Sequence, residues 1–240
     1  MHLSIIVPAY NEEKNLENSI KNFFDYLKNQ NYDFEVIIVN DGSTDRTIEI
    51  AKELKDKYNN LRIIDNDTNR GKGAVVRQGF LEATGKYRLF IDADNATTIN
   101  HLDLVWPHFE NGADIVIGSR NHRDATSAYQ KTKQPAWKRF FGMCGNYFIQ
   151  LLTVRGIWDT QCGFKIITDE ASKKIIPKLK CKRWAFDVEI LLLMEKAGYK
   201  IKIIPVEWNN SENSRVGVKG YFITLIEIIK IKYNSILKKY

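Results

Sequence analysis

Two aspartates, Asp92 and Asp94, follow the apolar run at residues 89–91 and are separated by a single residue. If that run is a strand, the two carboxylates share a face and repel each other unless a cation lies between them. Mg²⁺ and Mn²⁺ prefer such oxygen ligands, and one or two carboxylates commonly hold them together with substrate phosphates. The spacing therefore predicts a divalent metal site, with two solvated aspartates in a turn as the alternative.

Two polar stretches earlier in the chain could bind an anion or a base. Lys72 stands between two glycines in "NRGKGAVVRQG", which suits a helix start where backbone amides and an ammonium group approach an anion. The spacing of a Walker A loop is absent. Asp41 and the following glycine in "NDGSTDRT" are typical of a turn before a helix capped by Ser43 or Thr44. Asp41 could fill this structural role and still contact a ligand.

Other ionisable residues carry weaker signals. Asp187 and Glu189 occur in "RWAFDVEILLLMEK", whose apolar residues recur at helical spacing. We interpret this segment first as a core helix, and a functional role for either carboxylate is the less favoured alternative. The four histidines form no metal-binding pattern and are interpreted as solvated or structural.

Alternating strands and helices would bring these residues together. Runs typical of strands, separated by segments of helical periodicity, occur at residues 3–7, 36–39, 62–64, 87–91 and 114–117. The alternation predicts an α/β fold with a mostly parallel, doubly wound sheet. Such sheets bind ligands at the carboxyl ends of their strands, where "PAYNE", "NDGSTD", "DTNRGKG" and "DADNAT" stand. We expect these four loops to meet at one edge.

The alternation ends near residue 121, and the charge changes with it. Residues 1–120 hold 14 basic and 19 acidic side chains, a net charge of −5, whereas residues 121–240 hold 22 and 10, a net charge of +12. No repeat or low-complexity linker separates the halves. We therefore expect one domain over residues 1–240, with the second half built onto the same sheet as an anion-binding side.

The composition favours a cytoplasmic protein that touches a membrane peripherally. The three cysteines form no CxxC pair, and the start lacks a basic leader. No segment reaches the roughly 18 apolar residues of a membrane span. Residues 140–154 carry no charge, and residues 220–240 place apolar side chains at helical spacing beside lysines. These segments could lie on a membrane surface, and a terminal helix packed on the core is the alternative for residues 220–240.

Taken in order, the motifs resemble family 2 inverting glycosyltransferases of the GT-A fold, whose Rossmann-like, mostly parallel sheet is flanked by helices. The likeness runs from "SIIVPAYNEE" to "PVEWNNSENSRV", most of the chain. Within that family, "DADNAT", "GSR", "DTQCGFK" and "RWAFDVEIL" are most similar to dolichyl-phosphate β-glucosyltransferases and their prokaryotic polyprenyl-phosphate relatives. The opening motif is common to the whole family, and the last two are much more specific.

The resemblance implies a nucleotide-sugar half (residues 1–120), an acceptor half (residues 121–218) and an amphipathic terminal helix (residues 219–240). It also implies donor-side roles for matching positions: Pro8, Ala9, Tyr10 and Glu12 would shape the nucleoside pocket, and Asp41 would contact the base. Lys72 would lie near the base and the phosphates. Asp92 and Asp94 would hold the metal, and Arg215 would contact the diphosphate. The implied catalytic residues are Asp94 and the acceptor-phosphate arginines Arg120 and Arg139, and the implied cofactor is Mg²⁺ or Mn²⁺.

The implied reaction is inverting transfer of a hexose to a polyprenyl or dolichyl phosphate, giving a β-linked product. Such a phosphate is mostly dianionic at neutral pH and needs no general base. The mannosyl-transferring relatives tend to read D-x-D-x-Q, and Ala96 stands at the last position here. This departure favours glucose from UDP-glucose over mannose from GDP-mannose, or a water that completes the metal coordination.

Two other functions stay open from the sequence. A family 2 transferase acting on a glycan hydroxyl would need a base such as Asp159 or Asp187. A nucleic-acid-binding protein would fit the basic, aromatic second half, but it leaves Asp92 and Asp94 unexplained. We therefore expect a nucleotide sugar, a lipid phosphate and a membrane surface as partners, and no nucleic acid.

Overall fold

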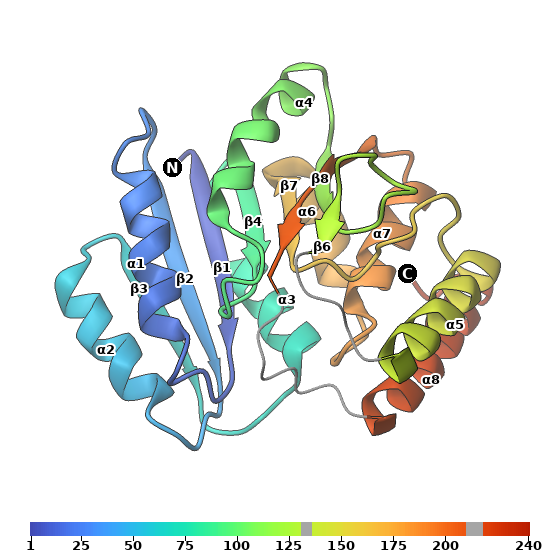
Figure 1. Ribbon diagram of the computed structural model, residues 1–240, viewed down its shortest axis with the longest axis horizontal. Coiled ribbons are helices and arrows are strands. Elements are labelled where there is room, and N and C mark those ends of the chain that lie inside the picture. The colour runs from blue at the N-terminus through green and yellow to red at the C-terminus, as the bar shows by residue number, and fades with distance from the viewer. Residues whose placement is uncertain (131–135, 210–217) are drawn as a thin grey trace.

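The computed structural model describes the backbone of residues 1–130, 136–209 and 218–240 (Figure 1). Side chains are described for residues 1–128, 142–209 and 220–240. The main sheet of this described part has the strand order β3-β2-β1-β4-β7-β5-β8. Its strands are β1 (Leu3–Ala9), β2 (Phe34–Asp41), β3 (Leu61–Asn66), β4 (Tyr87–Ile91), β5 (Ile115–Ser119), β7 (Phe164–Thr168) and β8 (Ile201–Pro205). A small second sheet pairs β6 (Tyr129–Gln130) with β9 (Glu207–Trp208).

Helices cover both faces of the sheet (Figure 1). One core lies beneath α1 (Leu16–Leu27), α2 (Thr47–Lys57), η1 (Ile99–Leu104) and α4 (Trp106–Glu110). The other lies beneath α3 (Lys72–Glu82), α5 (Ala136–Leu152), α6 (Asp169–Ile175), α7 (Phe186–Lys196) and α8 (Val218–Ile236), with a short turn η2 (Ile176–Lys178) after α6.

The sheet is mostly parallel, as the sequence predicted. β1 pairs in parallel with β2 and β4, and β2 with β3. The second half does add to this sheet, but through a strand that the sequence analysis did not identify. β7 lies antiparallel between β4 and β5, and β5 then pairs in parallel with β8. The apolar segment "YKIKIIPVEW" is divided between β8 and β9, which belong to different sheets.

Residue alternation explains how each strand serves two cores. In β1, Leu3, Ile5 and Val7 face the α1 side, whereas Ile6 faces the α3 side. β1 stays paired with β4 only as far as Ile6, so the two strands separate before they end. Their loops therefore leave a common edge at the carboxyl ends of the strands.

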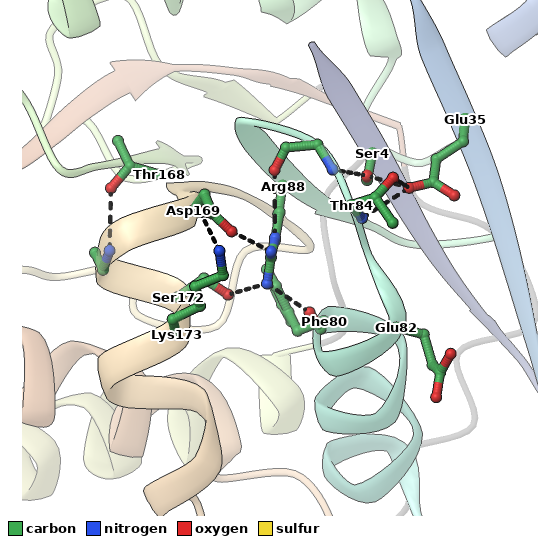
Figure 2. Close-up of polar contacts among 12 residues, drawn as sticks. Ser4, Glu35, Phe80, Glu82, Thr84, Arg88, Thr168, Asp169, Ser172 and Lys173 are labelled. Carbon is green, nitrogen blue, oxygen red and sulfur yellow. Dashed lines mark hydrogen bonds and ion pairs between the residues drawn. The ribbon is translucent and has the colours of Figure 1, made fainter. Parts of the chain in front are cut away.

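A polar network closes the opposite end of the sheet (Figure 2). The buried Glu35 accepts hydrogen bonds from Ser4 Oγ (2.6 Å), Thr84 N (2.9 Å) and Thr84 Oγ1 (2.7 Å). Arg62 adds an ion pair at 2.8 Å. Together the partners bind β1, β2, β3 and the end of α3 to one another.

Arg88 is the second centre of this end (Figure 2). Its guanidinium pairs with Asp169 at the start of α6 and donates to the carbonyl of Phe80, 2.9 Å away, near the end of α3. A cavity of about 640 Å³ opens beside Arg88, Asp169 and Ser172. Because Arg88 is already bound to protein groups and lies at the start of β4, this cavity is separate from the loops that carry the predicted site.

The helices α5 and α8 pack side by side at the edge of the molecule and expose apolar side chains (Figure 1). The large exposed residues are Met143, Tyr147 and Leu151 on α5 and Phe222, Ile226, Ile229, Tyr233 and Ile236 on α8. We call this set the α5/α8 face. Within the described residues, no helix has both the length and the apolar character needed to cross a membrane.

Candidate active site

The loops after β1 and β2 are bound to each other by side-chain hydrogen bonds. Asn11 N donates to Ser43 Oγ (2.9 Å), and Thr44 N donates to Asn11 Oδ1 (2.7 Å). Glu12 N donates to Thr47 Oγ1 (2.7 Å). Asn11 has a φ of 53°, which turns the chain sharply after β1. The two loops therefore form one rigid rim.

The predicted capping of the next helix by Ser43 or Thr44 is wrong. α2 begins at Thr47, and Asp45 Oδ1 accepts a hydrogen bond from Thr47 N (3.0 Å). Ser43 and Thr44 bind the first loop instead, because the backbone N–H of Asn11 donates to Ser43 and its side-chain Oδ1 accepts from Thr44.

The residues predicted to form the nucleoside pocket lie on or beside this rim. Pro8 and Ala9 are buried at the end of β1, and Tyr10 is 37% exposed. The Glu12 carboxylate accepts a hydrogen bond from Asn15 Nδ2 (2.8 Å). The structure thus brings these four residues together at the carboxyl end of the sheet, and their contact with a nucleoside stays a prediction.

Asp41 fixes the neighbouring loop. Its Oδ1 accepts from Arg70 N (2.6 Å) and its Oδ2 from Gly71 N (3.1 Å). Burial raises the pKa of Asp41, and the two amides and nearby arginines only partly oppose this effect. Asp41 thus has a structural role, but it holds the loop at residues 70–71 and not the turn expected from the sequence, and the base contact stays a prediction.

The helix start at Lys72 was predicted, but the use of its backbone amides as an anion site was wrong. Gly73 N donates to Arg183 O (3.1 Å), and Ala74 N donates to Lys182 O (3.1 Å). Gly71, at φ 96°, lies so close that a Cβ there would be 2.4 Å from Lys182 O. These amides are occupied by a neighbouring loop, so the ammonium group of Lys72 is the remaining candidate for an anion contact.

Lys72 provides the positive charge that the two aspartates require. Its Nζ lies 2.6 Å from Asp92 Oδ1, and the two side chains are 27% and 30% exposed. Asp94 Oδ1 accepts from Ala96 N (3.0 Å). Burial opposes the charge of Lys72, but Asp92, Asp187 and Asp94 together outweigh it and raise the pKa of the ammonium group.

The donor atoms around Asp92 and Asp94 fit a hard divalent cation. Both carboxylates are partly open to solvent, and Asn95 Oδ1 beside them is buried and has no hydrogen-bond partner among the described residues. Within the described residues, no cluster of three or more His, Cys, Asp or Glu could enclose a metal by itself. Two carboxylates completed by substrate oxygens and water are the arrangement that Mg²⁺ and Mn²⁺ accept.

Sequence reasoning missed two residues of "CGFK" that support this site. A Cβ at Gly163 would lie 2.1 Å from Asp92 Oδ2, so only glycine leaves room for that carboxylate. Lys165 is completely buried; its Nζ lies 2.6 Å from Asp187 Oδ1 and donates to Cys162 O (2.7 Å). The signal for Lys165 was a single charge within an apolar run, which indicates a buried ion pair.

Arg120 is held by Asp159. Its Nε and Nη2 donate to the two Asp159 oxygens (2.7 and 2.8 Å), and its backbone N donates to Asp159 Oδ2 (2.7 Å). Burial works against both charges, but the pair raises the pKa of Arg120 and lowers that of Asp159. The charge of Asp92 contributes to the rise in the pKa of Arg120, so the guanidinium lies near the loop that carries Asp92 and Asp94.

Trp208 lies between Arg120 and the loop that follows β4, which carries Asp92 and Asp94. Its ring lies 5.4 Å from the guanidinium carbon of Arg120, and Trp208 forms a β-bridge with Thr97. The next residue, Asn209, donates to Ala96 O (2.9 Å). Of the remaining predicted residues, Arg139 belongs to a part of α5 whose side chains are not described, and Arg215 lies outside the described residues.

Comparison with known proteins agrees with this geometry. The family model "Glycosyl transferase family 2" matches residues 4–176. The chain is 35% identical to dolichyl-phosphate beta-glucosyltransferase ALG5D of Trichomonas vaginalis, over 96% of this chain and 73% of that protein. It is 36% identical to dolichyl-phosphate beta-glucosyltransferase of Dictyostelium discoideum, over 99% of this chain and 76% of that protein.

A solved structure with a similar fold is glucosyl-3-phosphoglycerate synthase from Mycobacterium tuberculosis, in complex with UDP. The two structures superpose with a TM-score of 0.70 at 16% sequence identity. The superposition covers 97% of this chain and 79% of the M. tuberculosis chain. The same enzyme has been solved with Mn²⁺ or Mg²⁺. The matching fold, the family model and the similarity over 73% and 76% of the two curated relatives agree, and the chain therefore belongs to family 2 of the glycosyltransferases and has the GT-A fold.

Proposed function

We propose that the chain transfers glucose from UDP-glucose, with inversion, to the phosphate of dolichol or a related polyprenol. The names of the similar proteins from T. vaginalis and D. discoideum support both the sugar and the lipid acceptor. The UDP bound to the solved M. tuberculosis neighbour supports the nucleotide. The position of Asp92, Asp94 and Lys72 at one sheet edge supports a diphosphate beside them.

The observation that carries the choice of acceptor is the state of Asp159 and Asp187, the two carboxylates considered as general bases. Asp159 accepts hydrogen bonds from Nε and Nη2 of Arg120, and Asp187 is paired with the buried Lys165. The pair with Arg120 lowers the pKa of Asp159, which makes this carboxylate a poor proton acceptor. Burial raises the pKa of Asp187, but this side chain is only 4% exposed and is held by Lys165, so an acceptor hydroxyl has little access to it. A hydroxyl acceptor would need that base, whereas a phosphate acceptor is already an anion.

On the donor side, Asp92 and Asp94 would hold Mg²⁺ or Mn²⁺, which would neutralise charge on the leaving diphosphate. Lys72 is proposed to lie near the base and the phosphates, and Arg215 is proposed to contact the diphosphate from the side opposite the metal. The rim formed by the first two loops would hold the nucleoside near Tyr10. The two loops of the rim are bound to each other before the sugar arrives, so this part of the site loses little free energy to reorganisation during transfer.

On the acceptor side, Arg120 and Arg139 are proposed to receive the lipid phosphate. Asp159 uses Nε and Nη2 of Arg120, which leaves its Nη1 edge for a phosphate oxygen. Asp159 would therefore orient the guanidinium for attack on the sugar. Arginine suits this task because its planar fork grips phosphate directionally.

A lipid acceptor requires the site to reach a membrane, and we propose the α5/α8 face as the contact. Its apolar residues are bordered on α8 by Lys230 and Lys232, which are available to anionic headgroups. This arrangement favours a helix pair lying in the interface. It also supports peripheral attachment to the cytoplasmic side of a membrane.

The test is a transfer assay with a panel of radiolabelled nucleotide sugars and a short-chain polyprenyl phosphate. We expect label in the lipid product with UDP-glucose and not with GDP-mannose, and a β-anomeric signal in its NMR spectrum. The matched acceptor control is the same polyprenol without phosphate, which should receive no sugar. Transfer to that alcohol, or to an oligosaccharide hydroxyl, would contradict the proposal.

A further inference from the structure

Two ion pairs lie between the interior of the sheet and the loop that carries Asp92 and Asp94, which we call the metal loop. Lys165 of β7 pairs with Asp187 at the start of α7, and Lys72 at the start of α3 pairs with Asp92 at the end of β4. Both pairs have an N–O distance of 2.6 Å. Exposure increases outward, from 0% for Lys165 to 30% for Asp92. We call this set the charge row.

Within the charge row, Lys72 occupies the carboxylate that is proposed to bind the metal. Its Nζ contacts Asp92 Oδ1 directly. An ammonium group and a divalent cation on the same carboxylate would repel each other strongly in this partly dry setting. The ammonium group must therefore leave Asp92 when the metal site fills.

Asp187 is the neighbouring carboxylate that can receive Lys72. The helix starts that carry the two residues are in contact, because a Cβ at Gly73 would lie 2.8 Å from Phe186 Cβ. Lys72 Nζ also lies 5.3 Å from the centre of the Phe90 ring, which packs against Phe186, the neighbour of Asp187. Asp187 is 4% exposed, and Lys165 Nζ lies 2.6 Å from its Oδ1. An ionised carboxylate has about four lone-pair sites, so it can accept a second donor beside Lys165. The flexible stem of a lysine allows its ammonium group to change partner without movement of α3.

Lys165 keeps Asp187 ready for this role. Burial raises the pKa of Asp187, and the charges of Lys165 and Lys72 oppose that rise. Lys165 cannot leave, because it is completely buried and also donates to Cys162 O. Asp187 therefore keeps one fixed cation and shares a second, movable one.

We propose that Lys72 is a resident counter-ion that pairs with Asp92 before donor binding and moves to Asp187 when a metal ion occupies Asp92 and Asp94, with Lys165 as the residue that positions Asp187. The inference rests on the metal role in the proposed function. It assigns Asp187 and Lys165 to the control of metal binding, not to proton transfer.

The test measures Mn²⁺ binding to the whole protein without nucleotide, and the EPR signal of free Mn²⁺ is the readout. Lys72→Met should tighten Mn²⁺ binding about fivefold or more, because it removes a competing cation. Asp187→Asn should weaken binding about fivefold, because Lys72 then stays on Asp92. Lys182→Met removes an exposed lysine near the same helix start and should change the affinity less than about twofold.

A double variant separates ion exchange from a general field effect. If Asp187 acts through Lys72, Asp187→Asn should have almost no effect in the Lys72→Met background. An equal effect in both backgrounds would overturn the inference and leave the metal role intact. A wild-type protein that binds no Mn²⁺ would overturn both.

Each variant is checked by circular dichroism and thermal melting. Lys72→Gln is a second, polar replacement, to be used if Lys72→Met does not fold. Tighter Mn²⁺ binding by a folded Lys72 variant is a gain that structural damage would not produce.

Discussion

Asp94 is a residue whose removal should separate metal binding from folding. Asp94→Asn halves the carboxylate charge opposite the cation, and the remaining amide oxygen can still accept from Ala96 N. We expect loss of transfer and of Mn²⁺-dependent UDP binding in titration calorimetry, with an unchanged circular dichroism spectrum. Full activity of this variant, or of the wild type in EDTA, would exclude the metal role.

Arg120 has to be tested with its partner in mind. Arg120→Ala should weaken use of the lipid phosphate by about 2–3 kcal/mol, as for a charge-assisted hydrogen bond. It also leaves Asp159 buried without its cation, which costs about 3–5 kcal/mol of stability. Arg120→Lys keeps the charge and loses the fork, so it is the cleaner probe.

For Arg120→Lys we expect a higher KM for polyprenyl phosphate and an unchanged KM for UDP-glucose. Arg123→Lys, a change at an exposed arginine nearby, is the control and should alter neither value. A rise in the donor KM alone would assign Arg120 to the nucleotide side.

Individual residues were predictable where local sequence fixes their place. Asp92, Asp94 and Lys72 could be assigned to one sheet edge because each follows a strand or opens a helix. Gly163 and Lys165 could not, because their roles depend on Asp92 and Asp187, which are distant in the sequence. The amides near Lys72 were misread for the same reason, since their partners are the carbonyls of residues 182–183.

Among the elements, the strands β1 to β5 and the helix α7 were predicted, because their segments have clear apolar periods. β7 was missed because its five residues, "FKIIT", contain a lysine that breaks the apolar run. Its antiparallel direction depends on a pairing between distant segments, which local periodicity does not encode.

The hydrogen bonds to Glu35, at the end of the sheet opposite the candidate site, predict how the stability of the protein changes in acid. Burial raises the pKa of Glu35, but hydrogen bonds from Ser4, Thr84 and Arg62 outweigh it and lower the folded-state value. This stabilisation is complete above the unfolded pKa of about 4.3 and is lost as pH falls through the lower folded value. The wild type should therefore lose stability steeply below about pH 5.

Glu35→Gln should cost about 1–3 kcal/mol at neutral pH and flatten that acid slope in urea titrations. Glu82→Gln, at a half-exposed position that also approaches Arg62, is the matched control and should leave the slope unchanged. Equal slopes for the wild type and Glu35→Gln would show that another carboxylate governs acid unfolding.

For the whole molecule, the α5/α8 face predicts reversible attachment to membranes. Ile226→Ser combined with Ile229→Ser should reduce sedimentation with vesicles that contain anionic lipid, because both side chains are about half exposed on α8. Leu104→Ser, at a similarly exposed residue on η1, should not. High salt or alkaline carbonate should release the wild type, and retention through the alkaline wash would contradict peripheral binding.

The position of β7 also constrains how the chain is made. The ribosome delivers β4 and β5 long before β7, yet β5 pairs only with β7 and β8 among the described strands. Until residue 168 has emerged, the edge of β4 stays unpaired and β5 has no neighbour, which exposes the nascent chain to aggregation. The half that carries the metal loop therefore cannot complete its sheet during synthesis, and a released fragment of residues 1–120 should aggregate and not fold.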